Sequence, residues 1–128
     1  MDREKLLDLY KKYELEKTDV YKHQHYVIIT RQGIEKIAAK ENIAISYEVV
    51  KCDPNFAVVK AYAKKEEVQI ETFGSALKGA NYKDGNCNSW YVMEMAEKRA
   101  LSRSVLKLTG FYELGVFGED ESDDFKRK

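Results

Sequence analysis

The sequence predicts an α+β fold, in which a three-stranded antiparallel β-meander packs against a long C-terminal helix, with one or two N-terminal helices. Two observations support this prediction. Apolar and polar residues alternate over residues 43–50, 56–64 and 68–73, which is the pattern of strands. Apolar residues then recur at helical spacing over residues 89–109. We therefore expect one domain over residues 1–118 and an acidic, disordered tail over residues 119–128.

The residues between the expected strands favour turns. Residues 53–55 are Asp-Pro-Asn, in which proline fixes φ and the other two side chains can bond to their own backbone. Residues 65–67 offer a second turn. In the middle strand, alanines such as Ala57 and Ala61 share one face. Their small side chains would allow a helix to approach closely.

Three further elements precede the meander. Apolar spacing predicts a helix over residues 2–14, followed by a polar connector over residues 16–23. The β-branched and aromatic run at residues 25–30 predicts a short strand, which we expect at a sheet edge. Thr30 can then cap a second helix over residues 31–41.

The long helix at residues 89–109 is apolar on two sides, so it should pack on two sides. We expect the sheet on one side and a neighbouring subunit on the other. Gly110 can end this helix in a left-handed conformation. Before it, residues 74–88 lose all periodicity and are expected to form a loop, and residues 111–117 after it form a short aromatic-rich return.

Composition narrows the function. The chain has 128 residues, with 22 basic and 22 acidic side chains, so it is not a generic polycation. No apolar run reaches the ~18 residues of a membrane span, and residues 1–5 do not suggest a secretory signal. Cys52 and Cys87 are too few for a disulfide framework, so we expect two buried thiols and a cytoplasmic protein. A zinc site that combines them with His23 and His25 fits no usual ligand spacing, and no metal is expected.

The sequence contains no specific catalytic constellation. There is no nucleophile paired with a base and no phosphate-binding glycine motif, so we expect neither an enzyme nor a cofactor. Basic and aromatic side chains are instead interleaved, as sequence-tolerant binding of single-stranded DNA (ssDNA) requires. The candidate ssDNA-binding residues are Arg31, Lys78, Tyr82, Lys83, Lys98, Arg99, Arg103 and Lys107.

The order of the elements and the run Met95-Ala-Glu-Lys-Arg-Ala-Leu-Ser-Arg-Ser-Val-Leu-Lys-Leu-Thr-Gly-Phe111 resemble single-strand annealing recombinases. These are the phage proteins of the essential-recombination-function (ERF) type and their eukaryotic recombination-mediator relatives. The chain is also similar to small proteins of phages and mobile elements with the same Gly-Glu-Asp-Glu ending. The resemblance covers about residues 31–118.

The resemblance implies homo-oligomeric rings or filaments, ssDNA in a basic groove between the meander and the helical part, and annealing without ATP. By position, Lys98, Arg99 and Arg103 match basic residues of the family. The resemblance also adds Lys60, which lies on the central strand with Lys64, to the candidate ssDNA-binding residues. The sequence is shorter than the family's, so we expect neither its long N-terminal section nor its folded C-terminal partner domain.

The tail and the helix leave alternatives open. Residues 119–124 contain five acids, so the tail carries a net charge of −2 and residues 1–118 carry +2. The tail can screen a basic groove, bind a protein partner or simply aid solubility. The alternative function is a phage-encoded protein-interaction module that inhibits a host protein through the two-sided helix. A five-stranded ssDNA-binding barrel fits less well, because it needs more strands.

Overall fold

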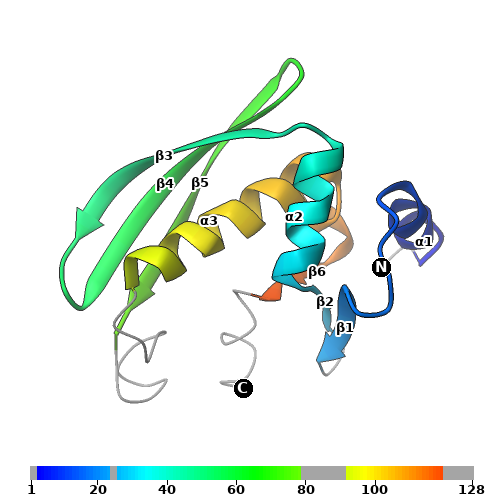
Figure 1. The fold of residues 1–128 in the computed structure, drawn as a ribbon, viewed down its shortest axis with the longest axis horizontal. Coiled ribbons are helices and arrows are strands. Elements are labelled where there is room, and N and C mark those ends of the chain that lie inside the picture. Colours follow the sequence, from blue (N-terminus) through cyan, green and yellow to red (C-terminus); the bar gives the residue numbers. More distant parts are fainter. Residues whose placement is uncertain (1–2, 24–25, 79–91, 120–128) are drawn as a thin grey trace.

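The computed structural model describes residues 3–23, 26–78 and 92–119 of the chain, and these residues form an α+β fold (Figure 1). The larger sheet arches over a long helix, and the smaller sheet and a second helix lie beside the C-terminal half of that long helix. The elements run in the order α1 (Arg3–Lys12), β1 (Val20–His23), β2 (Tyr26–Ile29), α2 (Arg31–Lys40), β3 (Ala44–Cys52), β4 (Phe56–Lys65), β5 (Val68–Leu77), α3 (Val92–Thr109), a 3₁₀ turn (Tyr112–Leu114) and β6 (Val116–Gly118).

The larger sheet is the expected antiparallel meander, with its strands in the order β3-β4-β5. The backbone N–H of Asp53 donates to the carbonyl of Phe56 at 2.8 Å and closes the first turn. The second turn passes through Glu66, whose φ is +54°. The register of β3 against β4 shifts between Val49 and Lys51, which leaves Val50 as an extra, bulged residue.

Helix α3 packs on β4 and β5 but barely reaches β3. The close approach depends on small residues, as the sequence predicted, because Ala57, Ala61 and Ala63 of β4 are fully buried against it. At Gly74 of β5 a Cβ atom would lie 2.1 Å from the carbonyl oxygen of Ala96. The helix backbone therefore rests directly on the backbone of β5.

The smaller sheet has the order β1-β2-β6, with β2 paired antiparallel to β1 and parallel to β6. Our prediction that this strand lies at an edge is therefore wrong. Strand β1 falls within the segment that we expected to be a polar connector, and β6 falls at the end of the aromatic return. Both strands have four residues or fewer, too short for periodicity to reveal them.

A second core joins this sheet to α1, α2 and the end of α3. Phe111 is fully buried at its centre, with its ring centroid 5.9 Å from that of Tyr13. Val105 and Leu106 of α3 are fully buried in the same core. The N-terminal part of α3, with Val92 and Ala96, thus packs in the core of the larger sheet, and its C-terminal part packs in this second core. That α3 also contacts a neighbouring subunit stays a prediction.

The ends of the helices follow the local sequence. The Thr30 hydroxyl accepts a hydrogen bond from the backbone N–H of Gly33 at 3.2 Å, so Thr30 caps α2 as predicted. Gly110, directly after α3, has a φ of +88°, which confirms the left-handed end of this helix. None of the described helices is long and apolar enough to span a membrane.

Two details of the meander differ from the prediction. Strand β5 continues to Leu77, whereas the sequence suggested a loop from Gly74 onward. Gly74 is a packing residue inside a strand and not a strand breaker. Cys52, which we expected to be buried, is exposed at the end of β3, and Cys87 lies outside the described residues, as does most of the expected loop.

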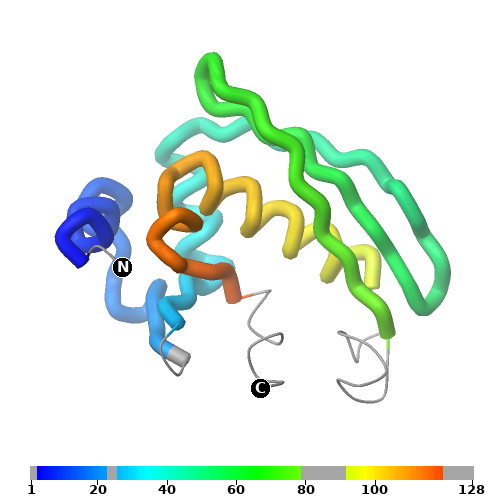
Figure 2. The backbone as a smooth tube through the Cα atoms, turned by 180° about the vertical axis from the view of Figure 1, so that it is seen from behind, coloured from blue at the N-terminus to red at the C-terminus, as the bar shows by residue number. Residues whose placement is uncertain are grey.

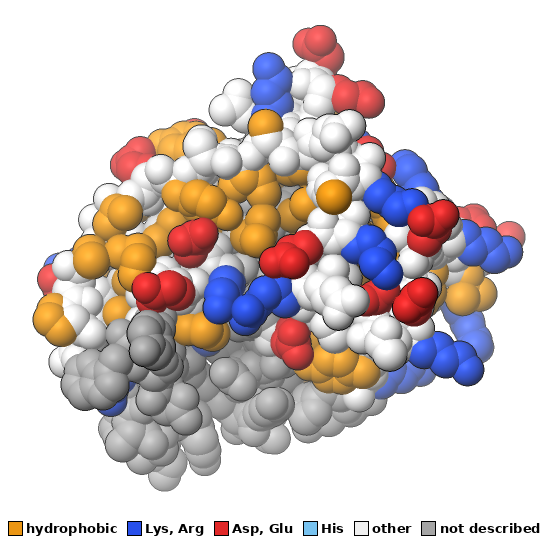
Figure 3. All heavy atoms as spheres, viewed as in Figure 1, with side chains coloured by type: hydrophobic (Ala, Val, Ile, Leu, Met, Phe, Trp, Pro, Cys, Tyr) orange, Lys and Arg blue, Asp and Glu red, His pale blue; other side chains and the backbone are white. Residues whose placement is uncertain are grey.

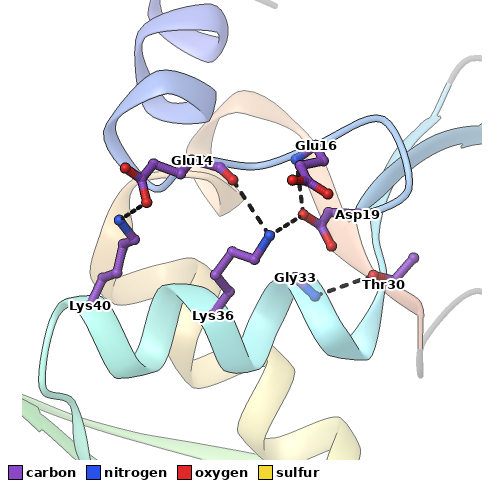
Figure 4. Close-up of polar contacts among 7 residues, drawn as sticks. All are labelled: Glu14, Glu16, Asp19, Thr30, Gly33, Lys36 and Lys40. Carbon is purple, nitrogen blue, oxygen red and sulfur yellow. Dashed lines mark hydrogen bonds and ion pairs between the residues drawn. The ribbon is translucent and has the colours of Figure 1, made fainter.

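A polar cluster ties α2 to the segment between α1 and β1 (Figure 4). Asp19 is fully buried, and its Oδ2 atom lies 2.7 Å from Lys36 Nζ and accepts from the backbone N–H of Glu16 at 2.9 Å. Burial acts to raise the pKa of Asp19, but these two hydrogen bonds outweigh it, so that pKa lies below its usual value. Beside this pair, Lys40 binds the more exposed carboxylate of Glu14.

Glu41, which follows α2, links the smaller core to the larger sheet. Its carboxylate accepts a hydrogen bond from the hydroxyl of Tyr13 at 2.5 Å. It also lies 3.2 Å from Lys12 Nζ of α1 and 3.3 Å from Lys65 Nζ of β4. The hydrogen bond from Tyr13 lowers the pKa of Glu41, so the carboxylate stays charged. One side chain therefore connects three elements.

Candidate nucleic-acid interface

One face of the larger sheet carries no covering element among the described residues. Helix α3 packs on the opposite face, and Figure 2, seen from behind, shows the three strands arching over that helix. We call the uncovered side the outer face. By strand register its residues are Ala44, Ser46, Glu48, Lys51, Phe56, Val58, Lys60, Tyr62, Lys64, Gln69, Glu71, Phe73, Ser75 and Leu77.

Lys60 lies at the centre of the outer face, between two aromatic rings. Its Nζ atom is 5.1 Å from the ring centroid of Tyr62 and 5.6 Å from that of Phe73. Phe73 is directly opposite Lys60 on the neighbouring strand and is 48% exposed. In such an arrangement the cation can bind a phosphate, and the solvent-exposed ring can stack on the flat face of a base.

Acidic side chains hold this arrangement in place. Lys60 Nζ lies 3.2 Å from Glu71 Oε2, and the hydroxyl of Tyr62 donates to Glu48 Oε1 at 2.6 Å. The hydrogen bond to Glu71 raises the pKa of Lys60, and the hydrogen bond to Glu48 raises the pKa of Tyr62. Lys60 therefore stays a cation at neutral pH, but a phosphate has to compete with Glu71 for it.

Sequence reasoning placed Lys60 at the site but missed Tyr62 and Phe73. The signal was present, because Lys60 and Tyr62 alternate along one strand and therefore share a face. Placing Phe73 beside them requires the register of the β4–β5 hairpin, which depends on the length of its turn. Periodicity identifies the strands but does not fix that register.

Arg99 and Arg103, two of the candidate ssDNA-binding residues, both bind the larger sheet. Arg99 is only 3% exposed, and its Nη1 donates to the carbonyl of Ser75 at 2.7 Å. Arg103 Nη1 donates to the carbonyl of Phe73 at 3.0 Å. Both side chains thus bind backbone carbonyls of β5, the edge strand beneath which α3 runs. In this arrangement they fasten the helix to the sheet.

The other candidate residues that the structure describes lie outside the three strands of the larger sheet. Arg31 begins α2, and its backbone N–H donates to Glu119 Oε1 at 3.1 Å. Lys98 and Lys107 lie on α3, where the ammonium of Lys107 sits 5.3 Å from the ring centroid of Tyr112. Lys78 directly follows β5. Tyr82 and Lys83 lie outside the described residues.

Apolar side chains form a second exposed area, on β3. Tyr47 and Val49 are opposite the buried Ala61 and Val59, so they point to the helix side of the sheet. They are nevertheless 39% and 57% exposed, because α3 does not extend over β3. Figure 3 shows hydrophobic side chains spread over this part of the surface, between β3 and α3.

The described residues contain no group of three or more acidic, histidine or cysteine side chains that could hold a metal ion. The outer face, with Lys60 beside the rings of Tyr62 and Phe73, is the surface that we consider for ligand binding. Comparison with known proteins adds no assignment, because no family model, no curated protein and no solved structure matches the chain.

Proposed function

We propose that the protein binds single-stranded DNA in phage or mobile-element recombination or replication, with the outer face as its binding surface. The observation that carries this proposal is the position of Lys60 between Tyr62 and the exposed ring of Phe73. Bases can stack on such rings whatever their sequence, while lysines bind the phosphates. By strand register the outer face has three lysines and two glutamates, which gives it a small positive excess.

An open antiparallel sheet favours single strands over duplex. Aromatic side chains on a sheet can reach only bases that are free to leave a stack, and a duplex keeps its bases paired inside. Strand annealing without ATP is part of the proposal because of the resemblance of residues 95–111 to annealing recombinases. A protein that displays stacked bases of one strand leaves their pairing edges available to a second strand.

The first test is binding of a labelled oligonucleotide of about 30 nucleotides, enough for several sites of ~4–16 nucleotides. We expect affinity to fall as salt rises, through the release of counterions. The Phe73→Ala variant should bind about 5- to 150-fold more weakly, the usual loss of one base–ring stack. The Lys60→Ala variant removes one phosphate contact. The slope of the logarithm of the binding constant against the logarithm of the salt concentration should therefore become about 0.7 less steep.

Two matched controls are available on β1, in the other sheet. Tyr21 is an aromatic residue that is 38% exposed, and Lys22 next to it is an exposed lysine. The variants Tyr21→Ala and Lys22→Ala should leave binding unchanged. Equal losses for Phe73→Ala and Tyr21→Ala would reject the outer face as the site. Absence of ssDNA binding even at low salt would reject the function.

A protein-interaction module, with inhibition of a host protein as one form, is the second candidate. The exposed apolar side chains of β3, Tyr47 and Val49 with Val50, favour this alternative because they resemble the centre of a protein interface more than a phosphate-binding surface. An absence of ssDNA binding combined with a fully folded protein would favour this alternative.

A further inference from the structure

We infer that the free edge of β3 is a self-association seam, at which two copies of the chain join their larger sheets through antiparallel pairing of β3 with β3. The resulting sheet would have six strands in the order β5-β4-β3-β3-β4-β5. This inference concerns the assembly of the chain and does not depend on the proposed nucleic-acid binding.

The two edges of the larger sheet differ in the part of the chain that the structure describes. At the other edge, Arg99 and Arg103 bind the carbonyls of Ser75 and Phe73 on β5. These carbonyls are the groups that an added strand would need. Strand β3 pairs with β4 on one side only, and it is nine residues long. A long edge strand with free backbone groups is a template for another strand.

The exposed side chains of β3 explain why a second strand would be stable there. Ile45, Tyr47 and Val49 lie on the helix side of the sheet, and the last two are 39% and 57% exposed. If β3 of a second copy lies beside this strand, its Ile45, Tyr47 and Val49 lie next to the same three residues of the first copy. The uncovered strip between β3 and α3 would then become a shared apolar layer between the two α3 helices.

The sequence of β3 is self-complementary about Tyr47. With Tyr47 facing Tyr47 of the second copy, Ile45 faces Val49 and Ser46 faces Glu48, each pair occurring twice by symmetry. Residues 45–49 are then all paired, and this segment ends before the bulged Val50. Centring the pairing on Glu48 would place two like charges face to face, which is unfavourable. Centring it on Ser46 would pair residues 44–48 and leave the exposed Val49 outside the paired segment. The register centred on Tyr47 is thus the symmetric one that pairs Ile45, Tyr47 and Val49 and avoids a charge conflict.

A pair of equally exposed valines tests the seam. Val49 on β3 and Val68 on β5 are 57% and 56% exposed. We expect the wild-type chain to sediment as a dimer at about 100 μM, as a Kd in the micromolar range requires. Val49→Asp should weaken the dimer by at least about tenfold, because it buries a carboxylate among apolar groups. Val68→Asp should leave the dimer intact. A wild-type monomer, or equal effects of the two variants, would overturn the inference.

Two charge variants at Ser46 test the register. Ser46→Glu would face Glu48 of the second copy at two symmetric positions and should weaken the dimer by about 2- to 30-fold. Ser46→Lys would face the same carboxylates and should keep or strengthen it. Both substitutions are at an exposed position, and thermal unfolding checks that each variant folds. The same effect from both variants would reject this register.

A crosslink provides an independent measurement. Residues directly opposite each other in antiparallel strands have Cα atoms about 4.5–5.5 Å apart, within the range that a disulfide spans. In a background with Cys52→Ser and Cys87→Ser, Tyr47→Cys should form a covalent dimer on oxidation. Ser46→Cys in the same background should not, because residue 46 faces residue 48 and not its own copy. Crosslinking at 46 but not at 47 would overturn the proposed pairing.

Discussion

Asp19 is the residue on which the smaller half of the molecule most clearly depends. It is fully buried and joins three backbone segments. Its carboxylate binds Lys36 of α2 and the N–H of Glu16, and its own carbonyl accepts from the N–H of Thr30 at 2.8 Å. A buried carboxylate is stable only when such partners replace water. The ionised carboxylate of Asp19 therefore contributes to the stability of the fold.

The Asp19→Asn variant should lose about 1.5–3 kcal/mol of unfolding free energy at neutral pH, the usual value of hydrogen bonds to a charged group. The pKa of Asp19 is lowered by folding, so its contribution is present above the unfolded pKa of about 3.9. It is lost as pH falls through the lower folded value, because the unfolded state then binds more protons. Urea unfolding at neutral and acid pH should therefore show a smaller acid loss in the variant.

Glu14→Gln is the matched control, because Glu14 also pairs with a lysine of α2 but its side chain is 75% exposed. An exposed pair contributes roughly 0–1 kcal/mol, so this variant should remain close to the wild type. Equal destabilisation by the two variants would show that the burial of Asp19 does not set the strength of its pair.

At the scale of elements, the contact of α3 with β5 sets the position of the long helix. Gly74 allows it, since a Cβ there would lie 2.1 Å from Ala96 O and 2.5 Å from Ala100 N. Beside this contact, the Thr72 hydroxyl donates to the carbonyl of Ala100 at 3.0 Å. The two contacts fix α3 against the edge strand, and the arginine bonds to the β5 carbonyls extend the attachment.

Gly74→Ala should destabilise the protein by about 3 kcal/mol or more, because both clashing atoms belong to the helix backbone and can move only with the whole helix. Thermal or urea unfolding measures this loss. Ser75→Ala, on the neighbouring exposed position of the same strand, is the control and should change stability by about 0.5 kcal/mol or less. A stable Gly74→Ala variant would mean that α3 can shift away from β5 at little cost.

The same elements show how far the sequence could predict the fold. The meander, the cap at Thr30 and the turn at Gly110 follow from local patterns, and all three were predicted. Strand β6 has three residues, and it pairs with β2 only after α3 has brought the chain back. No local pattern encodes such a pairing. The loop predicted from Gly74 onward was wrong, because the sequence does not distinguish a glycine that permits close packing from one that ends a strand.

The candidate site illustrates a similar limit. Lys60 could be named from the sequence, but its two rings come from different positions along β4 and β5. Arg99 and Arg103 are of the residue type that commonly binds phosphates, but here their side chains donate to backbone carbonyls of β5. Composition identifies the charged side chains of a chain. Tertiary packing decides which of these charged side chains bind the backbone of a strand.

At the scale of the whole molecule, the net charge of zero combines a body of +2 with a tail of −2. The first tail residue, Glu119, accepts a hydrogen bond from the N–H of Arg31 at the start of α2. A carboxylate at the N-terminus of a helix is favourably placed with respect to the helix dipole. The tail therefore begins against the N-terminus of α2.

Removing residues 119–128 should strengthen ssDNA binding by about two- to tenfold at low salt, because the acidic side chains no longer compete with phosphates. The difference should shrink as salt rises, since screening weakens both interactions. Titration of the shortened and full chains at several salt concentrations measures it. Unchanged affinity at every salt concentration would show that the tail does not compete for the binding surface.

The parallel pairing of β2 with β6 has a consequence for the order in which the protein can assemble. The meander joins neighbours in sequence, so it can form from local contacts as soon as its strands exist. The smaller sheet has to wait, because Ile28 finds its partner only when Phe117 has been made. During synthesis, apolar residues of β2 and α2 therefore remain without their final cover until residues 116–118 have left the ribosome.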